Sequence, residues 1–114
     1  MNVYRYPENP LVTPKDVKPS VEGWEVMCAF NAGAAQYRDE IVLLVRVAER
    51  PRNDKDGVVL VPMVNCRSEE PHIEVLSFTA DTPGINLSDP RVVTLQGQMM
   101  LTSLSHLRLA RSKD

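Results

Sequence analysis

The sequence predicts an all-β protein, and three observations lead to that prediction. No segment of its 114 residues shows a sustained helical period. Short apolar runs rich in β-branched residues are separated by turn-forming segments, which is the pattern of strands joined by loops. Prolines are spaced through the first 25 residues and exclude a regular helix there, because proline removes a backbone donor and clashes with the preceding turn; they are Pro7, Pro10, Pro14 and Pro19.

The spacing of the prolines divides the chain into two parts. Residues 1–25 are predicted to form an extended N-terminal arm that wraps a larger body. Residues 26–114 carry the predicted strands. The first two strands, residues 33–37 and 41–49, flank Arg38-Asp39, and this arrangement predicts a hairpin.

The remaining strands follow at short intervals. Ile41 to Val45 form a nearly continuous apolar run, which is typical of a strand buried on both faces. Residues 51–57 and 80–90 have the Pro, Asn, Asp and Gly content of loops. Further strands are predicted at 58–64, 72–78, 91–95, 99–104 and 107–110, with a turn at Gly97. These roughly seven strands make fewer than two four-stranded propeller blades, so we expect the chain to stop before a β-propeller is complete.

Composition excludes several classes of function. A net charge of −2 and a pI near 5.7 provide no basic surface for nucleic acid or an anionic membrane, and 5% aromatic residues do not make a base-stacking platform. The first ten residues have no apolar signal core, and the longest apolar run is too short to span a bilayer. Cys28 and Cys66 lack metal-ligand spacing, so we expect two reduced, partly buried thiols, no metal, and a cytoplasmic location.

Asp89 is the residue with the best case for catalysis. It precedes Pro90 and Arg91 at a predicted junction between a loop and a strand. Proline restricts the residue before it to extended geometry, so the carboxylate has a defined direction. Such a carboxyl can act as a general acid if burial raises its pKa. The residues alone favour the simpler interpretation, an ordinary Asp-Pro turn.

Other polar residues near the apolar strand have two interpretations each. Arg46 pairs with a carboxylate or donates to a sugar or an anion, and Glu49 lies three residues further along the same strand. Asn31 either binds a sugar hydroxyl or closes a turn. Ser105 and His106 alternate on a strand and therefore face opposite sides, so a Ser/His hydrolase is not expected.

Five stretches of the sequence stand in a recognisable order and spacing: Asn9 to Pro14, Phe30 to Ala34, Leu43 to Arg50, Asp89 to Val92 and Leu101 to Ser105. Together they resemble the N-terminal third of glycoside hydrolase family 130. Within that family the likeness is to its β-1,2-mannobiose and β-1,2-oligomannan phosphorylases. It covers nearly the whole chain and is weakest between Pro51 and Ala80.

The resemblance implies a fold and a set of site residues. It implies a five-bladed β-propeller, of which residues 26–114 form the first one to two blades, with the active site at the central cavity. Asp89, in the Asp-Pro-Arg motif, is implied to be the general acid. Asn31 and Arg46 are implied to line the mannosyl subsite, and Glu49 and Arg91 to line or support it. Many family members have Glu before the catalytic Asp, where this chain has Ser88.

The resemblance also implies a reaction. A β-mannoside and inorganic phosphate, the co-substrate, would yield mannose 1-phosphate with inversion and without a cofactor. Phosphate is already nucleophilic, so one carboxylic acid suffices, whereas an inverting hydrolase also needs a base to activate water. The alternatives are a β-1,2-mannosidase of the same family and a non-catalytic carbohydrate-binding propeller. Phosphate-binding residues are expected on later blades, so the 114 residues alone are predicted to be inactive. A homo-oligomer is compatible with this prediction.

Overall fold

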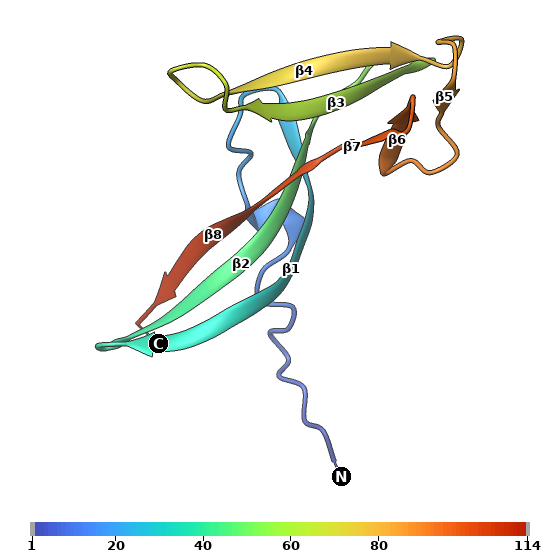
Figure 1. The fold of residues 1–114 in the computed structure, drawn as a ribbon. Coiled ribbons are helices and arrows are strands. Elements are labelled where there is room, and N and C mark those ends of the chain that lie inside the picture. The colour runs from blue at the N-terminus through green and yellow to red at the C-terminus, as the bar shows by residue number, and fades with distance from the viewer. Residues whose placement is uncertain (1, 114) are drawn as a thin grey trace.

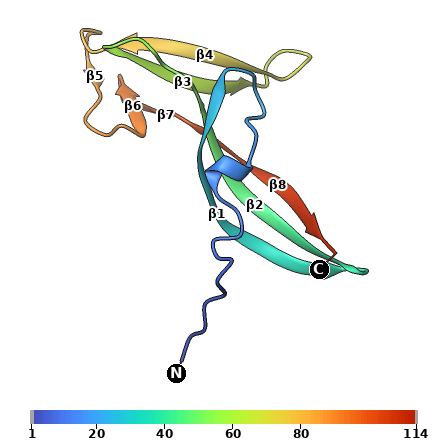
Figure 2. The same cartoon turned by 180° about the vertical axis from the view of Figure 1, so that it is seen from behind.

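The computed structural model describes residues 2–113 (Figures 1 and 2). This part of the chain contains eight β-strands and one turn of 3-10 helix, arranged in three separate sheets. The predicted all-β class is confirmed. Within residues 2–113, no helix has the length and apolarity needed to cross a membrane.

The segment before the first strand, residues 2–23, is called the arm. It has no strand, but it is not free of helix as the prolines predicted, because η1 (Pro14–Asp16) forms one 3-10 turn. Proline is tolerated at the first position of such a turn, where its missing N–H has no partner to lose. The Asp16 carboxylate accepts hydrogen bonds from the backbone N–H and the hydroxyl of Thr13, both at 2.8 Å, and closes the turn. Both views show η1 lying against the long sheet (Figures 1 and 2).

The long sheet has the order β1-β2-β8, with all pairs antiparallel: β1 (Trp24–Tyr37), β2 (Glu40–Pro51) and β8 (Leu104–Ser112). The predicted hairpin at Arg38-Asp39 is confirmed, and Arg38 has a positive φ of 56° in its turn. β1 begins at Trp24, nine residues before the predicted strand. Pairing with β2 over this length extends the strand through Gly33 and the small residues beside it.

The two faces of the long sheet differ in burial. The face under the arm contains Val45 and Val47, which are 5% and 0% exposed. The prediction that Ile41 to Val45 are buried on both faces is wrong, because Leu44, on the face away from the arm, is 43% exposed. Strand residues alternate between faces, and the arm covers one face only.

The second sheet is the hairpin of β3 (Val58–Asn65) and β4 (His72–Thr79). It lies across one end of the long sheet (Figure 1). The predicted strands at 58–64 and 72–78 are confirmed within one residue. Most of β4 is exposed, including Ile73 and Val75 at 42% and 44%.

The third sheet has the order β5-β6-β7, comprising β5 (Ile85–Asn86), β6 (Val92–Leu95) and β7 (Gln98–Leu101). Gln96 and Gly97 both have positive φ, 51° and 77°, as in the favoured two-residue hairpin turns, and the predicted turn is confirmed. β5 lies inside a segment predicted to be a loop. Two residues are too few for a sequence period to show.

The chain packs loosely. Val61, Val93 and Met100 form a small core between the second and third sheets. The radius of gyration is 18.0 Å, whereas a compact domain of this length has about 13 Å. The three sheets therefore do not close around one common core.

Candidate active site

Asp89 and Arg91 form a pair in the loop between β5 and β6, as the Asp-Pro-Arg sequence places them. The Arg91 backbone N–H and Nε–H donate to Asp89 Oδ1 at 2.9 Å and 3.1 Å, and Nη2 donates to Oδ2 at 3.0 Å. Pro90 lies between them, and its carbonyl accepts a hydrogen bond from the Thr102 hydroxyl at 2.9 Å. The Thr102 N–H donates to the Arg91 carbonyl at 3.0 Å. The loop is thus pinned to the end of β7, and both carboxylate oxygens have a fixed direction.

Asp89 does not have the raised pKa that burial would give to a general acid. Its side chain is 41% exposed and that of Arg91 is 83% exposed. The Arg91 side chain, and then its backbone N–H, hold the pKa of the Asp89 carboxyl below its ordinary value, and Asp89 in turn raises the pKa of Arg91. Burial does not raise the pKa of Asp89 in this chain. A role as proton donor therefore requires Arg91 to leave Asp89.

Arg46 and Asn31 lie at a distortion of the long sheet. The pairing of β1 with β2 shifts between Phe30 and Ala32, so Asn31 is the extra residue of a β-bulge. Bulges reorient side chains and are common beside active sites. The Arg46 guanidinium lies 4.7 Å from the centre of the Phe30 ring, a cation–π distance, and no carboxylate within residues 2–113 pairs with it. The expected structural ion pair is absent there, and Arg46 is exposed.

A groove of about 360 Å³ lies between the arm and the bulge. Asn9 to Val12 of the arm form one wall, and Asn31 lines the other side together with Phe30. Leu43 and Val45 add further apolar lining. Two amides beside apolar surface suit a sugar, which presents hydroxyls and C–H groups.

Glu49 is buried under the arm and is only 1% exposed. Its Oε1 accepts a hydrogen bond from the Ser20 backbone N–H at 2.5 Å, and its Oε2 accepts one from the Ser20 hydroxyl. His106 Nε2 and Arg108 Nη2 lie 3.3 Å and 3.9 Å from Oε2. These four residues, Ser20, Glu49, His106 and Arg108, are called the Glu49 cluster.

The structure brings together some of the predicted residues and separates others. Asp89 and Arg91 are bonded to each other. Arg46 and Glu49 lie on opposite faces of β2, because they are three residues apart on a strand. That separation was readable from the sequence, whereas the partners of Glu49 were not, because Ser20 is 29 residues away. The binding roles of these residues stay predictions.

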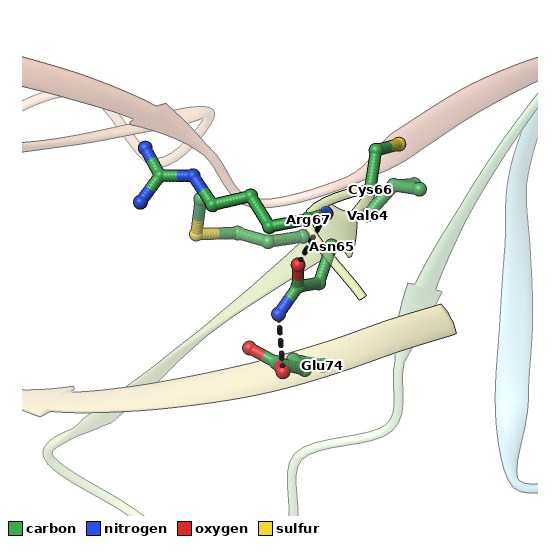
Figure 3. A pocket seen from close by; sticks show the side chains of 6 residues that line it. Val64, Asn65, Cys66, Arg67 and Glu74 are labelled. Carbon is green, nitrogen blue, oxygen red and sulfur yellow. Dashed lines mark hydrogen bonds between the residues drawn. The ribbon is translucent and has the colours of Figure 1, made fainter. Parts of the chain in front are cut away.

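A second cavity, of about 420 Å³, lies where β3 turns toward β4 (Figure 3). Asn65 donates to Glu74 at 2.9 Å, and the pKa of Glu74 is lowered by this bond first and then by His72. The Cys66 sulfur and the Arg67 guanidinium point away from that bond (Figure 3). The polar groups therefore do not converge on one point.

Between residues 2 and 113 there is no group of three or more His, Cys, Asp or Glu that could hold a metal ion. Cys28 is half-buried, as predicted, but Cys66 is exposed. Its position beyond the end of β3 leaves it uncovered.

Two comparisons with known proteins bear on this chain. It is 49% identical over its whole length to a β-1,2-mannobiose phosphorylase of Listeria innocua, of which it covers 33%. Among solved structures it matches a β-1,2-mannobiose phosphorylase from Listeria innocua in complex with β-1,2-mannobiose, with a TM-score of 0.84 and 48% identity over 99% of this chain and 33% of that chain. No family model matches the chain. The chain thus spans about a third of the length of these relatives, and the resemblance indicated by its motifs is confirmed.

Proposed function

This chain is related to a β-1,2-mannobiose phosphorylase and matches one third of its length. On that premise we propose that it takes part in the inverting phosphorolysis of β-mannosides, most of all those with a β-1,2 linkage. The products are mannose 1-phosphate and the shortened sugar. The observation that supports this most strongly is the combined match in sequence and fold over the whole chain. We place this reaction in the cytoplasm. It uses inorganic phosphate as its co-substrate and needs no cofactor.

The fold proposal is that residues 26–114 form the first one to two blades of a five-bladed propeller, with residues 1–25 as its arm. The three small sheets and the large radius of gyration support it, because they leave sheet faces to be covered. The exposed apolar side chains on the outer face of the long sheet include Leu107 and Leu109, at 60% and 56% exposure. Neighbouring blades would cover such faces.

The chemical proposal assigns the proton to Asp89. A phosphate oxygen attacks the anomeric carbon and the bond from that carbon to the glycosidic oxygen breaks. The proton of Asp89 reaches the departing oxygen directly or through a sugar hydroxyl, so no base is needed. Arg91 must first release the carboxylate, and a bound anion would offer its guanidinium another partner. Asn31 and Arg46 are proposed to contact the mannosyl unit.

A chimaera tests this function directly. The 114 residues replace the matching third of the Listeria innocua enzyme, and the chimaera is incubated with β-1,2-mannobiose with and without phosphate. We expect mannose 1-phosphate only when phosphate is present. If free mannose forms at the same rate without phosphate, the protein is a hydrolase and the phosphorylase assignment is wrong. A folded chimaera that binds mannobiose without cleaving it would favour the non-catalytic alternative.

A further inference from the structure

The burial of Glu49 needs an explanation. Glutamate is almost never fully buried unless it is paired. Glu49 is 1% exposed, and no other charged residue between positions 2 and 113 is buried. Removing a carboxylate from water is costly, so its partners must compensate for the lost hydration. Neither Asp89 nor Arg46 is held in this way.

The partners of Glu49 come from the arm and from β8. Ser20 of the arm donates twice, through its backbone N–H and its hydroxyl. Arg108 of β8 lies 3.9 Å from Glu49 and donates from Nη2 to the Lys18 carbonyl at 2.9 Å. Arg108 Nε also donates to His106 Nε2 at 3.0 Å, so this nitrogen, 3.3 Å from Glu49 Oε2, accepts a hydrogen bond and does not donate one to the carboxylate. One carboxylate and one guanidinium thus hold two backbone positions of the arm.

The rest of the arm has no comparable attachment. The other hydrogen bonds of its described residues up to Ser20 are local, such as that from Asn9 N–H to the Tyr6 carbonyl at 3.1 Å. Upstream of η1 the arm meets the sheet through apolar contact, where Val12 and Val45 line the same grooves. Apolar contact is not directional and does not fix the position of the arm along the sheet.

We propose that Glu49 is a positioning residue that fastens the arm to the long sheet and so sets the wall formed by Asn9 to Val12 opposite Asn31. The part of this inference that concerns substrate rests on the proposed function, with the mannosyl unit against Asn31 at the rim of that groove. Glu49 itself does not touch the sugar. Its charge is fully engaged under the arm, and it acts through the arm.

The test uses Glu49→Gln in the chimaera, which keeps the shape and removes the charge. The matched control is Glu25→Gln, which removes a carboxylate that pairs with Arg50 at 2.6 Å at the exposed edge of the same sheet. Arm opening is read from the rate of tryptic cleavage after Lys15, because the bond from Lys18 to Pro19 resists trypsin. We expect Glu49→Gln to speed this cleavage on the order of 10- to 100-fold, the size expected for a lost charged hydrogen bond, and the control to leave it unchanged.

Kinetics separate positioning from a merely structural role. We expect KM for β-1,2-mannobiose to rise about ten-fold in Glu49→Gln while kcat stays within about three-fold, because the groove wall is displaced but the acid is untouched. An unchanged cleavage rate would overturn the fastening role. Faster cleavage with an unchanged KM would overturn the positioning role.

Two further outcomes keep the inference separate from the proposed function. A chimaera that shows no phosphorolysis, but whose arm still opens faster in Glu49→Gln, would refute the function and support the fastening. If Glu49→Gln does not fold, Ser20→Ala replaces it, because this exposed residue loses only the hydroxyl bond. We then expect a smaller increase in cleavage, and no increase would overturn the proposal.

Discussion

Glu49 and Asp89 are two carboxylates of one chain in opposite surroundings. Glu49 is 1% exposed, and its partners come from the arm and from β8, distant in the sequence. The Asp89 side chain is 41% exposed, and its partner Arg91 is two residues away. Breaking the contacts of Glu49 separates segments of the fold, whereas breaking those of Asp89 releases only Arg91 in the same loop.

This difference in burial distinguishes a carboxylate with a structural role from one that can take part in a reaction. A buried carboxylate needs its hydrogen bonds to distant segments to offset its lost hydration. Its role is therefore structural. A carboxylate with one local, exposed partner can exchange that partner for a ligand at small cost, because exposed ion pairs contribute little to stability. The same reasoning assigns Glu49 to the arm and leaves Asp89 available for proton transfer.

The largest effect is expected from the isolated 114-residue chain. Asp89 and Arg91 are both present in it, but the exposed carboxyl keeps its lowered pKa and has no phosphate held beside it. We expect no measurable phosphorolysis, compared with the chimaera at equal concentration. We also expect association or a broad unfolding transition, because uncovered sheet edges and apolar faces recruit other chains. An active monomer with one sharp melting transition would contradict the proposed blade arrangement.

Next in size is the effect of Glu49→Ala on stability. The substitution removes the two hydrogen bonds that the buried carboxylate accepts from Ser20, each worth about 1.5–3 kcal/mol. Glu25→Ala, at an exposed pair, should cost about 0–1 kcal/mol. Chemical unfolding of the two chimaera variants measures the difference. Equal losses would remove the distinction between the two kinds of carboxylate.

A smaller effect is expected from Arg91→Met on the titration of Asp89. Because Arg91 lowers the pKa of the folded carboxyl, the pair stabilises the folded state at neutral pH and this contribution is lost as the pH falls through the lowered pKa. Removing the guanidinium should raise the pKa toward its ordinary value, as measured by NMR of the labelled carboxyl. An unmoved pKa would show that Arg91 does not control the acid.

Local patterns in the sequence predicted much of the fold. The turn at Arg38-Asp39, the turn at Gly97 and the strands of the β3–β4 hairpin follow from turn chemistry and residue type, which neighbouring residues decide. The burial of Ile41 to Val45 was wrong, because an apolar run does not reveal whether a second layer covers each face. The start of β1 was missed, because small residues form a strand only where a partner strand pairs with them.

The candidate site was predicted unevenly for the same reason. The place of Asp89 and Arg91 at a junction between a loop and a strand could be predicted from three consecutive residues, but the hydrogen bonds between them were not predicted. The Glu49 cluster could not, because its partners are brought together only by the path of the arm across the sheet. The lowered pKa of Asp89 was also missed, since it depends on the side-chain direction of Arg91 and not on the presence of a charge nearby.

The most direct test of this account is the kcat of Asp89→Asn in the chimaera, measured as mannose 1-phosphate released at saturating mannobiose and phosphate. The substitution keeps the shape of the side chain and removes its transferable proton. We expect kcat to fall about 10²- to 10⁴-fold, the usual contribution of a general acid, with an unchanged melting temperature. A kcat within a few-fold of the parent chimaera, at the same melting temperature, would show that Asp89 is not the acid.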